Sequence, residues 1–291
     1  MHQTVSKVAA PRLKRIISKV EVERKFNLGP DFASFFLSKG LVKPEALRFR
    51  VHNTRTGSSF IAVRQPGQII RDTYYDTQND QLSNLGLWVR QRHVQLFPLD
   101  CSAQTSHQGR EVVGEAISVP TTSNSQKSRW NAKLRLGGHF KNSQFLELDG
   151  KKKVSDEVLR ITGSTTKLED LQIVTDLRTE RSSWEVAEFD DGERPSTKMT
   201  IVLDDVTEAQ AREDGSDKSA FAHTIGEVEL FEEFVTEGMD STEHEALRKK
   251  IAAQRMEELK GFMVENPDLF ATTPTPIGKL SAYYTWKAAR S

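Results

Sequence analysis

Two carboxylates and an ammonium group alternate with other residues in KVEVERKFNL, the segment from Lys19 to Leu28. Glu21, Glu23 and Lys25 take every second position, and side chains at that spacing share one face of a β-strand. Grouped carboxylates without a histidine or cysteine partner offer hard oxygen ligands, which favour Mg²⁺ or Mn²⁺ over Zn²⁺. The segment therefore predicts a strand whose charged face could hold a divalent cation.

Other segments place charges at the same spacing. A second acidic pair stands in GEVEL, two basic pairs stand in LWVRQR and AKLRL, and one acid of VLDDV has the matching parity. These positions are Glu227 and Glu229, Arg90 and Arg92 with Trp88 before them, Lys133 and Arg135, and Asp204. Grouped arginines and lysines suit phosphate oxygens. A metal ion that bridges carboxylates to a phosphate chain held by cations is typical of phosphoryl transfer, so a polyphosphate ester is the expected ligand.

The alternation alone leaves two orientations open. Each charged face could lie in water over an apolar sheet face, which is the commoner arrangement for any one strand. Solvated faces normally mix positive and negative charges, however, whereas here acids pair with acids and bases with bases. A barrel with its polar faces turned inward would instead gather an acidic wall and a basic wall around one lumen, with helices covering its apolar outer face.

Period-two alternation predicts many strands and few helices. Strands are expected near 20–27, 46–52, 58–64, 68–76, 86–96, 110–118, 129–136, 144–148, 172–178, 182–189, 197–206 and 221–235. Helices are expected near 31–38, 154–161 and 241–264, and in the terminal segment PIGKLSAYYTWKAAR. The absence of βαβ alternation favours a mainly β fold, an antiparallel barrel with helices packed outside. We expect one domain over residues 20–291, after a flexible basic arm over residues 1–19.

Composition excludes several classes of function. Lys and Arg together number 41, as do Asp and Glu, so no global field favours nucleic acid or a membrane surface. The single cysteine, Cys101, rules out an internal disulfide and multi-cysteine zinc sites, and it indicates a reducing compartment. No apolar run approaches the roughly 18 residues of a membrane-spanning helix. We expect a cytoplasmic monomer that binds neither nucleic acid nor membrane.

Seven short segments carry a resemblance to a known family. EVERK fits the E-x-E-x-K signature of the CYTH superfamily, the triphosphate tunnel metalloenzymes. EVERKF, RDTYYDT, LWVRQR, WNAKL, TERSSW, GEVEL and GKLSAYY resemble, in order and approximate spacing, the thiamine-triphosphatase branch of that superfamily. The resemblance covers residues from about 20 to 286 and implies an eight-stranded antiparallel β-tunnel.

The resemblance also implies roles for individual residues. The implied Mg²⁺ ligands are Glu21, Glu23, Asp204, Glu227 and Glu229. The implied triphosphate-binding residues are Lys25, Arg90, Arg92, Lys133, Arg181 and Lys279. Trp88 falls where the family places an aromatic ring against the thiazolium, and Tyr74 with Lys133 resembles the pair thought to deprotonate the attacking water. Arg135 is expected near the tunnel mouth, and Trp130 in the core.

Two points stay open at this stage. Tyr74 and Tyr75 face opposite sides of one strand, and parity does not say which is inside. Lys133 is expected among other cations, which would lower its pKa and suit a general base. It could equally be a permanently charged clamp for phosphate.

The expected activity is Mg²⁺-dependent hydrolysis of thiamine triphosphate to the diphosphate and phosphate, with Mn²⁺ as a possible substitute metal. Three alternatives remain: a triphosphatase acting on inorganic or nucleoside triphosphates, an adenylate cyclase of the same fold, and a polyphosphate-binding module without catalysis.

Overall fold

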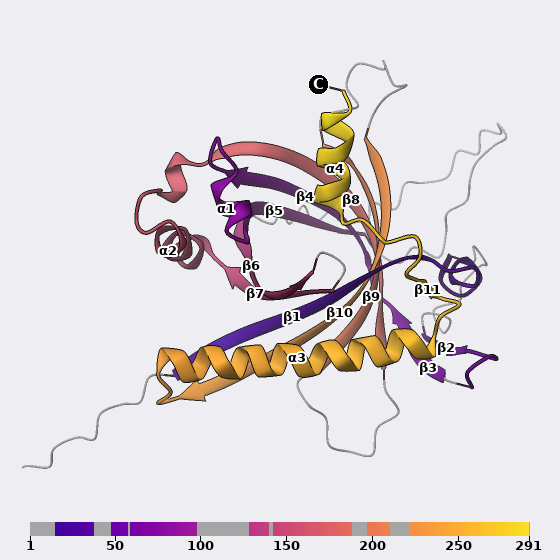
Figure 1. The fold of residues 1–291 in the computed structure, drawn as a ribbon. Coiled ribbons are helices and arrows are strands. Elements are labelled where there is room, and N and C mark those ends of the chain that lie inside the picture. The colour runs from indigo at the N-terminus through magenta and orange to yellow at the C-terminus, as the bar shows by residue number, and fades with distance from the viewer. Residues whose placement is uncertain are drawn as a thin grey trace, which may run out of the picture.

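The computed structural model describes residues 15–37, 48–57, 59–97, 128–139, 142–187, 197–209 and 221–290 of the 291. In this part of the chain, long antiparallel strands curve around a central space, and helices lie outside and at one end (Figure 1). The strand expected at 110–118 and Cys101 lie outside the described residues.

The strands of the sheet follow the predicted segments closely. They are β1 (Arg15–Leu28), β2 (Arg48–His52), β3 (Ser59–Arg64), β4 (Gly67–Asp76), β5 (Leu87–Phe97), β6 (Arg129–His139), β7 (Asn142–Asp149), β8 (Gln172–Ala187), β9 (Thr197–Glu208), β10 (Ala222–Glu237) and β11 (Phe270–Ala271). Neighbouring strands run in the order β8-β4-β5-β6-β7-β1-β10-β9, and β9 pairs again with β8. These eight strands therefore close into the expected antiparallel barrel, while the β2–β3 hairpin extends from β8.

The helices pack around this barrel. They are α1 (Gln81–Asn84), α2 (Lys151–Ile161), α3 (Ser241–Glu265) and α4 (Lys279–Ala288), with a π-helical turn at Ala33–Leu37 and a 3-10 turn at Leu168–Asp170. The long α3 runs along the outside of β1 and β10 (Figure 1). Asp240 caps its N-terminus by accepting hydrogen bonds from the backbone N–H groups of Thr242 and Glu243. No described helix is both long enough and apolar enough to span a bilayer.

The main apolar core lies between the outer face of the barrel and α3. Val20, Val22 and Phe26 of β1 are buried there against Met256 and Leu259 of α3. These β1 residues alternate with Glu21, Glu23 and Lys25, so the same period that sends apolar side chains outward sends charged ones inward. The orientation that the segregated charges favoured is the one the structure adopts.

Helix α4 closes one end of the barrel. Its Tyr283 packs with Tyr74, Leu177 and Val206 in a second apolar cluster. Tyr74, Leu177 and Val206 stand on the inward-facing positions of β4, β8 and β9, as their register with charged neighbours shows. The inner face is therefore apolar where α4 covers it and charged where the lumen remains.

A few predicted boundaries were wrong. The strands expected at 172–178 and 182–189 are one continuous strand, β8. Inward-facing Arg181 pairs with Asp204 of β9, so the stretch between the two expected strands stays in the sheet. β1 begins at Arg15, so residues 15–19 belong to the strand and not to the basic arm; residues 1–14 lie outside the described residues. The single turn α1 was not predicted.

Gly226 of β10 provides a test of how tightly the outer core is packed. It lies opposite Phe26 of β1, and a Cβ atom at Gly226 would come within 2.3 Å of the Phe26 ring. The ring packs against Phe32 and Phe270 and has little room to move. We expect Gly226→Ala to lower the free energy of unfolding by about 1–3 kcal/mol, measured by urea denaturation.

Gly261 in α3 supplies the matched control, because a Cβ there meets no atom within 4 Å. Gly261→Ala should raise stability by up to about 1 kcal/mol through helix propensity alone. A Gly226→Ala protein as stable as the wild type would contradict the packing described here.

Candidate functional site

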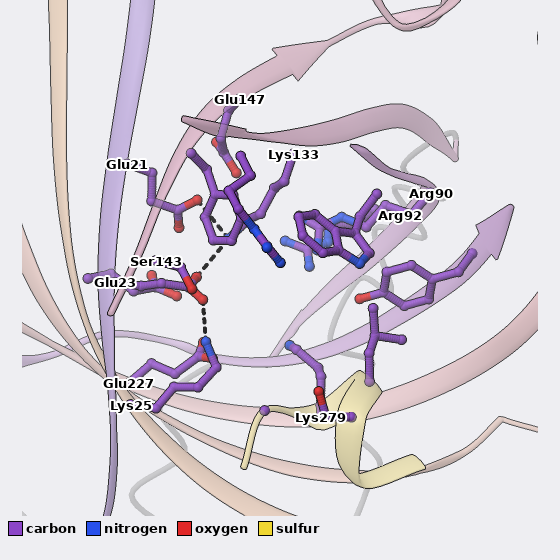
Figure 2. A pocket seen from close by; sticks show the side chains of 18 of the residues that line it. Glu21, Glu23, Lys25, Arg90, Arg92, Lys133, Ser143, Glu147, Glu227 and Lys279 are labelled. Atoms are coloured by element: carbon purple, nitrogen blue, oxygen red, sulfur yellow. Dashed lines mark hydrogen bonds and ion pairs between the residues drawn. The ribbon is translucent and has the colours of Figure 1, made fainter. Parts of the chain in front are cut away.

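A cavity of about 240 Å³ occupies the lumen of the barrel. Its walls come from the inward-facing positions of the barrel strands and from the start of α4. The lining residues include Glu21, Glu23, Lys25, Tyr74, Trp88, Arg90, Arg92, Lys133, Arg135, Ser143, Phe145, Glu147, Arg181, Glu227, Glu229 and Lys279. In Figure 2 the carboxylates of Glu21, Glu23 and Glu227 lie on one side of this space, and Arg90 and Arg92 lie on the other. The predicted acidic and basic walls are therefore both present.

Three carboxylates form the centre of the acidic wall. Glu21 and Glu23 of β1 and Glu229 of β10 each place a carboxylate oxygen within 4.8 Å of the others. The register puts Glu23 directly opposite Glu229. All three side chains are buried. Burial raises the pKa of Glu21, and the neighbouring acids add to that rise while Lys133 only partly offsets it. Burial likewise raises the pKa of Glu229, despite the attraction of Arg181.

Lys133 of β6 reaches over the intervening strand β7 to this acidic wall. Its Nζ lies 2.6 Å from a Glu21 oxygen and 3.0 Å from a Glu23 oxygen, and Figure 2 shows both contacts. Burial disfavours the ammonium form, but Glu21, Glu23 and Glu147 outweigh it and raise the Lys133 pKa well above its usual value. The expectation that Lys133 lies among cations was wrong, because its nearest charged neighbours are the carboxylates of Glu21 and Glu23.

Lys25 closes the acidic wall on the other side. Its ammonium group donates a hydrogen bond to Glu23 and lies 3.4 Å from Glu227. Although burial opposes the charge, these two carboxylates raise the Lys25 pKa. Burial would raise the pKa of Glu23, but Lys133 and Lys25 hold it well below its usual value. Glu23 thus stays ionised between two cations.

Arg90 and Arg92 of β5 form the basic wall. Both are held by Asp72, a residue of β4 that is only 1% exposed. Arg92 donates to both Asp72 oxygens, at 2.7 Å and 2.6 Å, and Arg90 lies 3.6 Å from one of them. Asn131 of β6 accepts a 2.9 Å hydrogen bond from Arg90 Nε. Two guanidinium groups are therefore fixed side by side at the lumen.

Two further cations meet at Asp204. Arg181 of β8 donates to both Asp204 oxygens at 2.7 Å, and Lys279 of α4 donates to one of them at 2.9 Å. Arg181 also lies 3.6 Å from Glu229. Asp204 is fully buried and is not one of the three clustered carboxylates. Its predicted role as a metal ligand stays a prediction, because its oxygens bind two cations here.

The aromatic residues divide as the strand parity requires. Tyr74 faces the lumen, whereas Tyr75 faces outward and packs against Trp130 with ring centroids 4.9 Å apart. Trp130 belongs to an outer cluster, as predicted. Trp88 lines the cavity, where the Phe145 ring meets it edge-on and the Arg135 guanidinium lies 4.8 Å from its ring centre. Arg135 is therefore a contact of the indole.

Four residues of the site were missed by the sequence reasoning. Ser143, Phe145 and Glu147 of β7 line the cavity, and Asp72 of β4 pairs with the lining residues Arg90 and Arg92. Asp72 stands two residues before Tyr74 and shares its face, but alternation alone does not say which face of that strand is inside. Ser143, Phe145 and Glu147 likewise alternate in NSQFLELD. The expected strand at 144–148 contains a single acid, Glu147, so the pairing of acids gives no signal there.

The carboxylate cluster suits a divalent cation. Glu21, Glu23 and Glu229 provide only oxygen donors, which Mg²⁺ and Mn²⁺ prefer. The raised pKa values of Glu21 and Glu229 show that the cations of the protein do not fully compensate the buried negative charge. A divalent ion held by these residues would supply the missing positive charge, so the donor set fits such an ion.

Comparisons with known proteins identify one matching family model. The CYTH domain model matches residues 38–255, while no curated protein matches the chain. Among solved structures, an adenylyl cyclase candidate from Hippeastrum, described as having a dominant triphosphatase activity, is 13% identical with a TM-score of 0.43, covering 92% of this chain and 95% of that one. An adenylate cyclase candidate from Bacillus halodurans is 12% identical with a TM-score of 0.31, covering 82% and 91% respectively. A protein from Pyrococcus horikoshii is 11% identical with a TM-score of 0.32, covering 83% and 89%.

Metal binding by the carboxylate cluster can be tested without any substrate. At pH 7, Mg²⁺ or Mn²⁺ should raise the melting temperature of the wild-type protein, because a ligand that binds only the folded state stabilises it. Glu21→Gln should remove most of that rise. The effect on the wild type should shrink toward pH 5, since protons compete with the metal for carboxylates whose pKa is raised.

The exposed carboxylate of Glu180, which pairs with Arg178, provides the control. Glu180→Gln should keep the full metal-induced shift. A shift of wild-type size in Glu21→Gln would show that the metal binds elsewhere.

Proposed function

The chain belongs to the CYTH domain family, and from that premise we propose that it is a metal-dependent hydrolase of thiamine triphosphate. The proposed reaction cleaves the terminal phosphoanhydride bond and releases thiamine diphosphate and phosphate. The observation that carries the proposal is the lumen itself, where an acidic wall, a basic wall and Trp88 line one cavity. We also propose that the protein is cytoplasmic and monomeric.

The cations of the lumen would bind the phosphate chain. Arg90 and Arg92 stand on β5, Arg181 on β8 and Lys279 at the start of α4, so they reach the cavity from different directions. Arginine can bind phosphate oxygens through two parallel hydrogen bonds. Several cations around one phosphate chain orient it and stabilise the charge that develops on the transferring group.

The acidic wall would hold the metal ion. Glu21, Glu23 and Glu229 are the proposed ligands, with Glu227 and Asp204 as further candidates. A bound Mg²⁺ would neutralise charge on the phosphate oxygens. Because Lys25 and Lys133 contact these acids and line the same cavity, they would contact the same phosphate group.

The proposal also covers the side chains around the attacking water. Lys133 lies within 3.0 Å of two carboxylates, which favour its charged form and oppose a role as base. We therefore assign Lys133 to phosphate binding. Tyr74, which lines the cavity beside Arg90 in the strand register, would orient the water.

Trp88 supports a substrate that carries an aromatic cation. The thiazolium of thiamine is such a group, and tryptophan is the best side chain for cation–π contact. The Arg135 guanidinium, however, already lies over the indole ring. This contact favours a second candidate function, hydrolysis of inorganic or nucleoside triphosphates, because a cationic ring would compete with Arg135 for the same indole.

Initial rates of phosphate release from thiamine triphosphate, inorganic triphosphate and ATP separate these candidates. We expect the highest kcat/KM with thiamine triphosphate. Trp88→Ala should raise KM for that substrate by roughly 5- to 30-fold, equivalent to about 1–2 kcal/mol, and change KM for inorganic triphosphate little. A wild-type preference for inorganic triphosphate would favour the second candidate, cyclic AMP formed from ATP would indicate a cyclase, and turnover of none would leave a binding module.

The role of Lys133 is tested by the pH dependence of kcat in Lys133→Arg, because arginine keeps the charge but cannot act as a base. For a phosphate-binding residue, the variant should keep the shape of the wild-type profile from pH 7 to 10. Its KM should rise by roughly tenfold, the scale of one charge-assisted hydrogen bond. Loss of an alkaline rise in kcat that the wild type shows would instead identify Lys133 as the base.

A further inference from the structure

Asp72 is a buried acid inside a site proposed for a highly charged anion. It lies on β4 directly opposite Arg92 of β5 and is 1% exposed. Both of its oxygens accept hydrogen bonds from Arg92, and Arg90 lies 3.6 Å from one of them. Neither its charge nor its position serves the metal cluster, which is formed by Glu21, Glu23 and Glu229.

The charge of Asp72 is unfavourable for anion binding taken by itself. A carboxylate next to two cations reduces the field that they present to a phosphate chain. Removing that carboxylate should then tighten anion binding, if charge alone decides. The geometry of the Asp72–Arg92 contact has the opposite effect on anion binding. A two-point contact fixes the plane of the Arg92 guanidinium, so removing the carboxylate should weaken binding. The two effects predict changes of opposite sign.

The surroundings favour geometry as the dominant effect. Long arginine side chains lose rotamer freedom when they bind a ligand, and a side chain already held in place loses less. Arg92 remains 23% exposed at the lumen while Asp72 holds two of its nitrogens. Arg90 is held from a second direction by Asn131. Each guanidinium carries five N–H donors, more than these contacts use.

We propose that Asp72 is a positioning residue, which holds Arg92 and, through the same carboxylate, Arg90 in the orientation that binds the phosphate chain. The inference rests on the proposed function only for the identity of the anion. Figure 2 shows the two arginines side by side on the wall opposite Glu21 and Glu23. A bound phosphate chain would lie between these two walls.

The test is the dissociation constant of inorganic triphosphate, measured by titration calorimetry in the presence of Mg²⁺. Asp72→Asn should weaken binding by roughly 10- to 100-fold, the scale of misplaced charge-assisted hydrogen bonds. Binding equal to or tighter than that of the wild type would overturn the proposal. Wild-type binding without hydrolysis would refute the proposed function and leave this inference intact, whereas a wild type that does not bind triphosphate would overturn both.

Asp176→Asn is the matched control. Asp176 of β8 makes the same two-point contact with an arginine of β4, Arg71, but on the outer face of the barrel. Losing that pair should leave the dissociation constant unchanged. If it weakens binding as much as Asp72→Asn does, the effect is general loosening of β4, and the proposal fails.

A double-mutant cycle separates positioning from a purely structural role. If Asp72 acts through Arg92, Asp72→Asn should weaken binding by less than about threefold in an Arg92→Gln background. Equal weakening in both backgrounds would show that Asp72 acts independently of Arg92. This comparison also applies if Asp72→Asn alone fails to fold, because the double variant leaves no buried carboxylate opposite a missing partner. A further tenfold loss in the double variant would then overturn the proposal.

Discussion

Buried charges must be compensated within contact distance, and the interior of this barrel is arranged around that constraint. An ionised group removed from water costs several kcal/mol unless opposite charges and hydrogen bonds replace the lost hydration. Accordingly, Glu23 lies between Lys25 and Lys133, Asp204 between Arg181 and Lys279, and Asp72 beside Arg90 and Arg92. Each of these acids keeps a pKa below its usual value, despite burial, because two cations attend it.

The compensation of buried charge is incomplete at one place in the lumen. Glu21 and Glu229 lie near further acids, and their pKa values are raised by burial and by those neighbours. Compensation inside the protein thus runs out where the three carboxylates meet. A metal ion bound there would be stabilised more by electrostatic attraction than at a fully paired site. It would also release Lys133 and Lys25 from the carboxylates, so that they could interact with a phosphate group. The same imbalance explains how one lumen could attract a cation together with an anion.

Much of this arrangement could be predicted from the sequence, because a strand has an exact period of two. Once the segregated acids and bases were assigned to one face, β1, β5 and β10 placed Glu21, Glu23, Arg90, Arg92, Glu227 and Glu229 in the lumen. The barrel itself followed from the number of strands and the lack of βαβ alternation. The resemblance added Arg181 and Lys279, for which the alternation had given no signal, and both meet at Asp204.

What could not be predicted is which charges touch. Parity gives the face of a strand, but the neighbour across the sheet depends on strand order and register, which are set by packing far away in the chain. Lys133 looked like a lysine among cations, yet only β7 separates β6 from β1, so its partners are Glu21 and Glu23. Asp72 was missed for the same reason: only the β4–β5 register reveals that it stands opposite Arg92.

With the proposed function, the lumen would separate recognition of the phosphate chain from recognition of the group attached to it. The charged walls surround the cavity on several strands and would serve any triphosphate, since every such ligand presents the same oxygens. The attached group would meet a smaller and chemically different surface formed by Trp88, Phe145 and Arg135. Trp88 and Arg90 stand two residues apart on the same face of β5. Trp88 belongs to the smaller surface, and Arg90 belongs to the basic wall. If the walls bind a phosphate chain as proposed, a substitution at Arg135 would change the surface beside Trp88 and leave the walls intact, so substrate choice could diverge while phosphate binding is retained.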